Sequence, residues 1–228
     1  YDLKTNATLV KNIEISKNAN VLRYADNQSD ALIQTKVIEN VKVERDGNVK
    51  CAYVELAANS IEMEINYAFI GENASATIRL AALARNVEKK HITLSLVHEA
   101  PYTTGIMDNY GVVKNQAGLV IDGIGTIKKA NHQSSSHQTN KIIVFDKDCK
   151  AKANPYLYID EYDVKASHGA SVGKIDEEHL YYLQSRGLSK EDAMHLVTYG
   201  YFIPVLEFID NDELKELFND TLKEKVGI

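Results

Sequence analysis

From about residue 37 to residue 159, apolar side chains occupy every second position in a succession of short stretches. Gly, Asn, Asp and Ser separate these stretches at roughly ten-residue intervals, and no amphipathic helical pattern interrupts them. A period of two places the apolar side chains on one face of an extended strand. The pattern therefore predicts a mainly β protein, with strands expected around Val37–Val43, Ile61–Tyr67, Ala76–Ala82, Ile92–Leu96, Leu119–Ile121, Ile142–Phe145 and Leu157–Ile159.

Many short strands without long helices are compatible with a β-sandwich, a β-barrel or a β-helix. Hairpin dipeptides are nearly absent, with Asp46-Gly47 as the one good candidate, so tight antiparallel turns are not the rule. Gly71–Asn73 and the polar run Asn131–Asn140 are predicted to form corners between the rungs of a β-helix. Tryptophan is absent and small aliphatic residues fill the inward positions, as narrow coils require. These features favour a β-helix with coils of roughly 20–25 residues, although the sequence has no clean internal repeat.

The sequence after Ile175 changes in both charge and periodicity. From Asp176 to Ile228 there are 12 acidic and 5 basic residues, whereas the first 175 positions carry 20 acidic and 21 basic residues. Apolar residues recur at helical spacing in this last segment. We therefore expect a β-helix core at 1–175 and a small C-terminal helical domain at 176–228, with the helices covering the open end of the β part.

Capping residues predict where the C-terminal helices begin and end. Asp176 is expected to cap the first helix, and Gly187 follows its last turn. Ser189 and Asp192 resemble a capping box that opens a second helix. The pattern further predicts that Gly200 closes this second helix, that Pro204 sits at the first position of a short turn, and that Asp212 caps the last helix.

Composition argues against several classes of protein. The balance of 44% hydrophobic and 25% charged residues is typical of a soluble globular chain. No stretch approaches the ~20 apolar residues that span a bilayer, and the first residues lack the basic-then-apolar pattern of a secretory leader, so we expect neither membrane insertion nor secretion. Cys51 and Cys149 indicate free thiols in a reducing compartment, so we expect a cytoplasmic protein. The net charge of −6 disfavours a nucleic-acid binder that is held by phosphate contacts.

Sequence motifs give little support for a metal or nucleotide site. His91 and His98 lie in or near one strand, and we expect them to be structural; His132 and His137 are expected in a solvated corner. The chain has neither Cys-x-x-Cys nor His-x-x-x-His spacing for zinc, no Walker motif and no Gly-x-Ser-x-Gly motif. Gly123-Ile124-Gly125 lacks the third glycine of a dinucleotide-binding loop. No catalytic residue is therefore assigned.

The segment from Val164 to Asp176 stands out because small residues surround one histidine, His168, between the last strand and the first helix. With its flanks, it resembles the SufB/SufD family of SUF iron–sulfur cluster assembly proteins, over residues 65 to 210. Ser167 and Gly169 flank His168 as in SufD-type members, where SufB-type members carry glutamates. The matching stretches are Val97–Thr104, Gln138–Lys141, Tyr156–Ile159, Asp163–Ala170 and Ile175–Gly187.

The resemblance implies a right-handed parallel β-helix followed by a C-terminal helical domain, in a compact and SufD-like scaffold subunit. Such a subunit pairs through its β-helix with a SufB-type paralogue or with a second copy, and its helical domain docks the ATPase SufC. His168 and Cys149 are the implied interface and cluster-assembly candidates, and thus the candidate metal ligands. Two ligands are too few for a cluster, so iron or a cluster would be held transiently with partner residues. The SufC-binding region is expected at Leu180, Tyr181, Leu183, Arg186 and Met194.

Two other functions stay open from the residues themselves. The acidic run Asp160–Asp163 resembles carboxylates of a carbohydrate-active β-helix enzyme, although a glycosidase needs two carboxylates facing each other across a cleft. A turn of solvated charges is the better interpretation of this run. The other alternative is a structural oligomerisation module, because an exposed β-helix edge pairs with a second copy as readily as with a paralogue.

Overall fold

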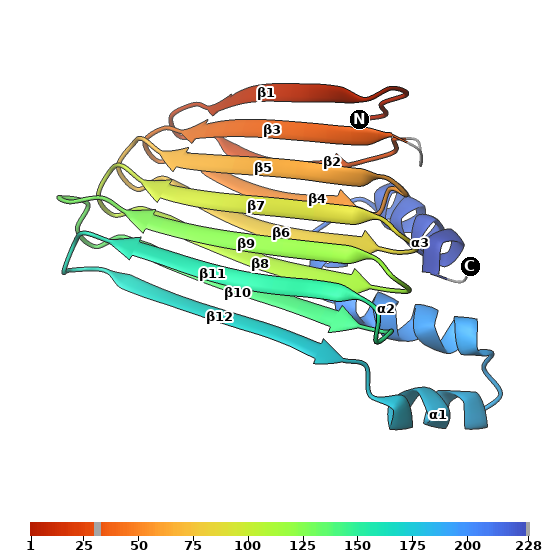
Figure 1. Ribbon diagram of the computed structural model, residues 1–228. Coiled ribbons are helices and arrows are strands. Elements are labelled where there is room, and N and C mark those ends of the chain that lie inside the picture. The colour runs from red at the N-terminus through yellow and green to blue at the C-terminus, as the bar shows by residue number, and fades with distance from the viewer. Residues whose placement is uncertain (30–32, 227–228) are drawn as a thin grey trace.

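The chain is a parallel β-helix followed by three helices, as seen in a computed structural model that describes residues 1–29 and 33–226 (Figure 1). Successive strands alternate between two sheets, an odd sheet in the order β1-β3-β5-β7-β9-β11 and an even sheet in the order β2-β4-β6-β8-β10-β12. Neighbouring strands within each sheet are parallel, so the predicted β-helix is confirmed. The strands are β1 (Ala7–Ile15), β2 (Asn20–Asp26), β3 (Gln34–Val43), β4 (Asn48–Glu55), β5 (Ser60–Phe69), β6 (Ser75–Ala84), β7 (Lys89–His98), β8 (Thr104–Val113), β9 (Gly118–Ile127), β10 (Ser135–Val144), β11 (Lys150–Ile159) and β12 (Lys165–Lys174).

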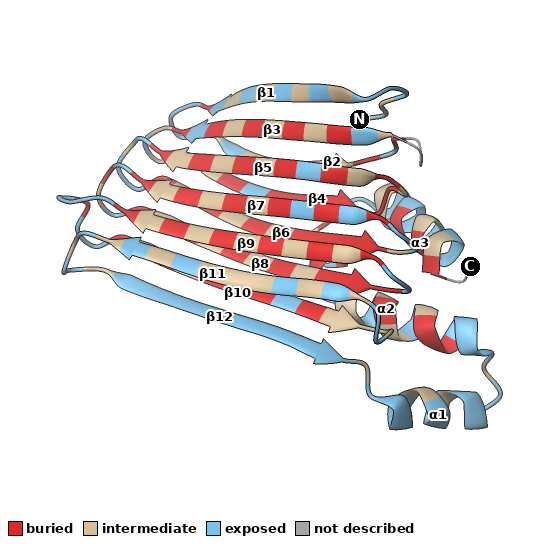
Figure 2. Cartoon of the chain, in the orientation of Figure 1, coloured by how far each residue is buried: buried red, intermediate tan, exposed pale blue. Residues whose placement is uncertain are grey.

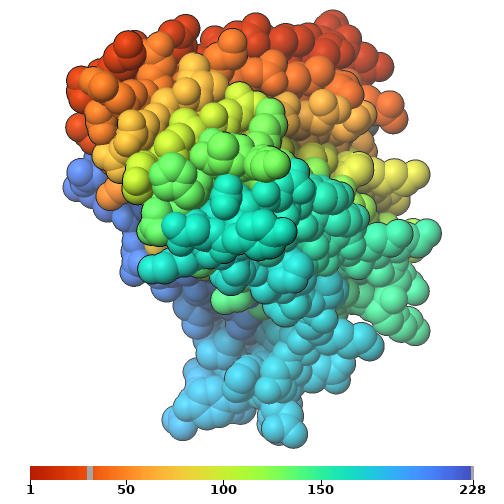
Figure 3. Space-filling view, turned by 90° about the vertical axis from the view of Figure 1, so that its left-hand side faces the viewer, coloured from red at the N-terminus to blue at the C-terminus, as the bar shows by residue number. Residues whose placement is uncertain are grey.

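Each coil of the β-helix is longer than the sequence pattern predicted. Equivalent positions recur every 26 to 32 residues rather than every 20 to 25, because one coil holds two strands of up to ten residues and two turns. Figure 3 shows the turns of successive coils stacked in chain order. The in-register positions of the odd sheet are Ala7, Thr35, Ile61, Lys90, Leu119 and Ala151.

The first five corners that lead into the even sheet share one backbone conformation. Their central residues have φ between 57° and 61°, the left-handed region that Asn and Asp tolerate best. Each of these amides donates a hydrogen bond to a carbonyl of the next coil, so the corners form a ladder of their own. Asp46-Gly47, the hairpin candidate, is one of these corners and joins two different sheets. The left-handed residues are Asn18, Asp46, Asn73, Tyr102 and Gln133.

Gly71 lies in one of these corners, where two coils touch backbone to backbone. A Cβ atom on Gly71 would overlap the backbone nitrogen of Arg45 and would lie 2.6 Å from the carbonyl carbon of Glu44. We expect Gly71→Ala to lower the free energy of unfolding by about 1–3 kcal/mol, because the neighbouring backbone has to move. Gly173→Ala is the matched control: no atom lies within 4 Å of a Cβ there, and it should change stability by less than about 1 kcal/mol. Urea unfolding measures both, and equal effects would contradict the close contact.

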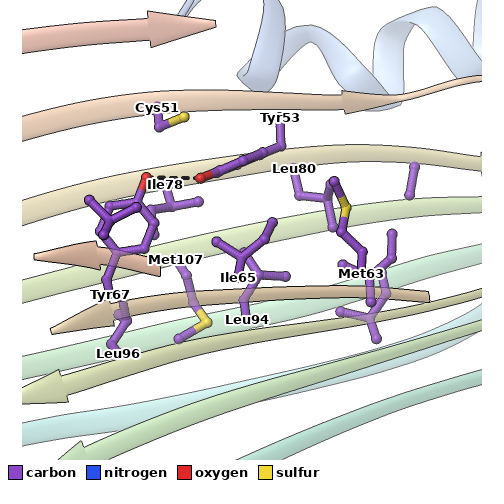
Figure 4. Close-up of a cluster of buried hydrophobic side chains, with 14 of the residues drawn as sticks. Cys51, Tyr53, Met63, Ile65, Tyr67, Ile78, Leu80, Leu94, Leu96 and Met107 are labelled. Carbon is purple, nitrogen blue, oxygen red and sulfur yellow. Dashed lines mark hydrogen bonds between the residues drawn. The ribbon is translucent and has the colours of Figure 1, made fainter. Parts of the chain in front are cut away.

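Inward side chains of the two sheets form the apolar core of the β-helix (Figure 4). Buried residues alternate with partly exposed ones along the middle strands, as the period-two pattern predicted (Figure 2). Most of the predicted inward residues are buried, and Leu157 and Ile159 in β11 are half-buried. The sequence pattern therefore identified the correct face of these strands.

A buried polar cluster interrupts the core in the first coils. The two guanidinium nitrogens of Arg23 lie 2.9 and 3.2 Å from the two carboxylate oxygens of Glu39. The Tyr53 hydroxyl donates to Glu39 and lies 3.0 Å from the Tyr67 hydroxyl. Although burial opposes ionisation, the hydrogen bond from Arg23 holds the pKa of the Glu39 carboxyl below its ordinary value. Beside the cluster, burial raises the pKa of the Cys51 thiol to about 11, so this thiol stays protonated at neutral pH.

The three helices are α1 (Glu177–Ser185), α2 (Lys190–Leu206) and α3 (Asp212–Val226). Asp176 caps α1 and Ser189 caps α2, as predicted. Gly187 adopts φ 95° after α1, and two backbone hydrogen bonds complete a Schellman motif there. Residues 227–228, the end of the predicted helical domain, lie outside the described residues.

Three of the predicted helix boundaries were wrong. Helix α2 continues through Gly200 and holds Pro204 in its last turn. Phe202 and Val205 make apolar contacts with the β-helix. These contacts outweigh the helix-breaking tendency of Gly200 and Pro204. Asn211 rather than Asp212 caps α3, because its side chain accepts from the Leu214 amide at 3.0 Å.

Helices α2 and α3 cover the outer face of the even sheet, not the open end of the β-helix as predicted (Figure 1). The reason is that β4, β6 and β8 end in residues that are apolar on both faces and supply a docking surface for the helices. Cationic side chains fix the helix ends in place. Arg79 donates to the carbonyl of Pro204, Arg85 to that of Lys225 at 2.8 Å, and Lys114 to that of Val226 at 2.5 Å.

Candidate functional site

The last coil leaves one end of the β-helix open. All ten residues of β12 are exposed, and none of the β11 residues is fully buried (Figure 2). Within the described part of the chain, β12 pairs only with β10 and β11 pairs only with β9. Both sheets therefore end here in a free edge, next to inward-facing side chains that no other coil covers.

His168 lies on the inward row of this open end. In register with β10, Ala166, His168, Ala170 and Val172 lie opposite Ser136, Gln138, Asn140 and Ile142, which are buried. The amides of Lys165 and Ile175 donate to β10 carbonyls. Since alternate residues of a strand bond to the same neighbour, the even-numbered residues of β12 direct their backbone N–H and C=O groups to the free edge. The side chain and the backbone of His168 are therefore both accessible to a strand that pairs with this edge.

The interior beneath His168 is polar, and this corrects the prediction that Asn131–Asn140 is a corner. Strand β10 begins at Ser135, and Gln138 and Asn140 point inward. The Gln138 amide donates to the Tyr156 carbonyl at 2.7 Å, and the Asn140 amide donates to the Asn154 carbonyl at 3.3 Å. Gly123 in β9 makes room for them, because a Cβ there would overlap the Gln138 side-chain oxygen. A period of two that continues through Ser136, Gln138, Asn140 and Ile142 is the sequence signal that could have placed this strand.

Cys149 lies at the other end of the last coil. It belongs to the turn between β10 and β11, and its Sγ is 3.4 Å from the Asn115 carbonyl oxygen. Strand β10 ends at Val144, opposite Lys174, whereas His168 lies six residues earlier on β12. At about 3.3 Å per residue, Cys149 and His168 are about 20 Å apart along the strands, so one chain does not bring them together. Burial raises the pKa of the Cys149 thiol.

The remaining histidines form no metal site. His91 lies 2.7 Å from the Asp122 carboxylate on the outer face of the odd sheet. His132 makes an edge-on contact with the Tyr102 ring, as expected for a corner. His137 does not lie in a corner but in β10, because the strand begins earlier than predicted, and it bonds the Ser135 and Ser167 hydroxyls. In the described ranges, no group of three or more His, Cys, Asp or Glu side chains could hold a metal ion.

His98 is structural, as predicted, and it makes stability depend on pH. Its Nδ1 lies 2.7 Å from the Thr103 hydroxyl, and burial lowers the pKa of His98 from 6.5 to about 4. Between these values the unfolded chain binds a proton that the folded chain does not, so folding weakens as the pH falls from 6.5 towards 4. We expect a loss of about 2 kcal/mol at pH 5 relative to pH 8.

Chemical denaturation of the wild type and His98→Gln at both pH values measures this effect. The variant should lack the loss due to His98, and equal losses in the two proteins would contradict the assignment. NMR titration of the wild-type imidazole gives a second test, because the ring should not titrate above about pH 5.

The predicted SufC-binding residues divide into an exposed and a buried group. Tyr181 and Arg186 are exposed on and just after α1, where Arg186 lies over the Tyr182 ring. Leu180 and Leu183 are half-buried, and Met194 is buried in the packing of α2. Three further exposed residues were not predicted from the sequence as part of this surface. These are Tyr182 on α1, and Leu196 and Ile203 seven residues apart on one face of α2.

Comparison with known proteins places the chain in a family. Residues 4–201 match the family model described as SUF system FeS cluster assembly, SufBD core domain. The chain is 31% identical over 156 residues to the iron–sulfur cluster assembly protein SufD of Bacillus subtilis, which covers 68% of the chain and 36% of that protein. It is 27% identical to SufD of Escherichia coli over 146 residues, 64% of the chain and 34% of that protein.

A broader match extends to a staphylococcal relative. The identity to an iron–sulfur cluster assembly SufBD family protein of Staphylococcus epidermidis is 24% over 205 residues, 90% of the chain and 44% of that protein. The chain therefore spans less than half the length of the curated relatives it matches. None of the helices in the described residues is both long and apolar enough to cross a membrane. Because the SufBD core model spans most of the β-helix and part of the helical segment, the chain belongs to the SufB/SufD family of SUF iron–sulfur cluster assembly proteins and is SufD-like.

Proposed function

We propose that this chain is a non-catalytic, SufD-like scaffold subunit of a cytoplasmic SUF assembly complex. In this proposal it pairs through β11 and β12 with a SufB-type paralogue or a second copy, and it docks SufC through its helices. The observation that carries the proposal is the open end of the β-helix, where β12 is exposed along its whole length beside two free sheet edges. Free edges of this length normally pair or are covered in a working protein.

The open end suits a second β-helix as its partner. Even-numbered residues of β12 supply backbone donors and acceptors for strand pairing, and Leu157 and Val172 supply apolar surface that a second coil would bury. In the interior beneath them, the buried side chains of Gln138 and Asn140 form a polar layer. A partner with the same architecture would continue both sheets across the junction, which the described part of this chain leaves uncovered.

The helical segment supports docking of a separate protein such as SufC. Exposed Tyr181 and Tyr182 on α1 and exposed Leu196 and Ile203 on α2 are apolar side chains that the β-helix does not use. Aromatic and aliphatic anchors of this kind dominate the energetics of protein interfaces. Arg186, held over the Tyr182 ring, would add a charged contact at the edge of this surface.

Iron or a nascent cluster would be cargo held between this chain and its partner. His168 is the residue of this chain that supports such a role, because it faces inward at the pairing edge. Cys149 is a weaker candidate, since it lies about 20 Å away along the strands and burial raises the pKa of its thiol. Partner residues would supply the other ligands.

We expect His168→Ala to reduce the cluster content of the assembled complex on the order of tenfold, the scale on which one lost metal-site group acts. Cys149→Ser is the control and should keep most of the cluster. Iron content and the absorption spectrum of the purified complex measure both variants, and light scattering checks that the complex still forms. Full cluster content in His168→Ala would contradict the role of this residue.

Co-expression with the cognate SufC and SufB, followed by affinity purification and mass determination, tests the proposed function itself. A complex that holds SufC and SufB supports the SufD-like role, and a complex of SufC with two copies of this chain supports a homodimeric scaffold. Absence of SufC from every complex, with or without ATP, would overturn the docking role.

A further inference from the structure

A groove of about 990 Å³ crosses the outer face of the odd sheet, over the first residues of its strands. None of the helices that the structure describes packs on this face, and α2 and α3 lie against the even sheet (Figure 1). The half of the groove over β7, β9 and β11 is rich in cations, and we call it the basic groove. Its outward residues are Lys89, His91, Gly118, Val120, Lys150 and Lys152.

Strand register sets the geometry of the basic groove. Lys89 and Lys150 flank Gly118, and His91 and Lys152 flank Val120. With strands about 4.8 Å apart and a rise of about 3.3 Å per residue, the three lysines and His91 sit at the corners of a rectangle of roughly 7 by 10 Å. The surface between these four residues is recessed, because Gly118 has no side chain and Val120 has a short one.

The charge of the basic groove is uncompensated. Lys89, Lys150 and Lys152 are exposed and have no ion-pair partner among the described residues. The nearby carboxylates are already engaged. Asp122 pairs with His91 at 2.7 Å. Lys36, in the other half of the groove, pairs with Glu62 at 2.9 Å and with Glu64, which lies beyond the groove, at 2.7 Å. Three unpaired cations remain on a chain whose net charge is −6.

From this arrangement we propose that the basic groove binds an extended acidic segment of a partner protein. A small anion would lack a cradle here, since β7 and β9 pair on both sides and use their N–H groups in the sheet ladders, and the Lys150 amide donates to the Ala117 carbonyl. A segment in extended conformation carries side chains on one face about 6.6 Å apart. Carboxylates at alternate positions therefore match the short side of the rectangle, which separates Lys150 from Lys152. A polynucleotide is the less favoured occupant, because the negative charge of the chain as a whole opposes it.

Fluorescence anisotropy tests this proposal on the full chain. The probe is a labelled twelve-residue peptide with glutamate at alternate positions, compared with the same peptide carrying glutamine instead. We expect the glutamate peptide to bind at low salt and to weaken as salt screens the charges, while the glutamine peptide should not bind. The triple variant Lys89→Gln, Lys150→Gln, Lys152→Gln should bind at least about tenfold more weakly.

The matched control is the triple variant Lys17→Gln, Lys42→Gln, Lys129→Gln. It has the same net charge, and its three exposed lysines lie outside the groove, with Lys42 on the same sheet face. It should bind the peptide within about twofold of wild type. The proposal is overturned if the wild-type chain does not bind the glutamate peptide, if both triple variants weaken equally, or if an oligouridylate of similar length binds more tightly than the peptide. These measurements require neither SufC nor SufB, so they are independent of the proposed scaffold role.

Discussion

Replacing Glu39 with alanine is expected to lower the free energy of unfolding by about 3–5 kcal/mol, the cost of breaking a buried ion pair by removing one partner. The Glu39 carboxylate is 1% exposed and receives hydrogen bonds from both Arg23 and Tyr53. Its loss leaves the Arg23 guanidinium without a counter-charge inside the first coils. Chemical denaturation at pH 7, where the carboxyl is ionised, measures the change.

The control for this variant is Glu62→Ala. Glu62 also forms an ion pair, with Lys36 at 2.9 Å, but its side chain is 54% exposed. Exposed pairs contribute little, so this substitution should cost less than about 1 kcal/mol. A double variant, Arg23→Leu with Glu39→Leu, should recover part of the stability lost in Glu39→Ala, because no unpaired charge remains buried. Similar losses in the two single variants would contradict the burial argument.

Apolar alternation predicted all or part of seven of the twelve strands, with their inward faces, whereas β1, β2, β4, β8 and β12 were not predicted. A one-residue shift in a strand would turn its whole apolar row outward. An apolar row such as Ile61, Met63 and Ile65 therefore determines which residues of the strand face the core. Coil length was not predictable in the same way, because turns of different lengths leave no fixed repeat in the sequence. The course of α2 was also missed. Local rules end a helix at Gly200 or Pro204, whereas contacts with residues more than 100 positions away sustain it.

The candidate site was predicted only in part. The small-residue segment around His168 was expected to follow the last strand, and this was wrong, because it forms strand β12 with His168 on the inward row of the open end. Its separation from Cys149 was not predictable, since it depends on which residues of β10 and β12 lie opposite each other. The burial of Gln138 and Asn140 was not predicted, because polar side chains of this kind normally lie on the surface. They are buried only because Gly123 on the facing strand leaves room for them.

Pairing through the free edge of β12 should be weakened by a proline that leaves the fold intact. In Ala170→Pro the lost N–H points to the free edge, because the residues that bond to β10 are the odd-numbered ones. Proline is tolerated on an edge strand in this orientation, so the chain should keep its far-UV circular dichroism spectrum. Removal of the central edge donor should weaken pairing with SufB or with a second copy by at least about tenfold, because main-chain hydrogen bonds supply much of the affinity when strands pair.

Two controls separate pairing from folding. Ala170→Ser keeps the backbone donor and should pair like wild type, whereas Ser171→Pro removes a donor that points to β10 and should lower the free energy of unfolding. Light-scattering mass across a concentration series, with SufB present or absent, measures pairing for each variant. If Ala170→Pro is folded and still pairs like wild type, the partner does not add strands to β12. The open end would then have to be covered through its side chains alone, with Val172 and Leu157 as the next residues to change.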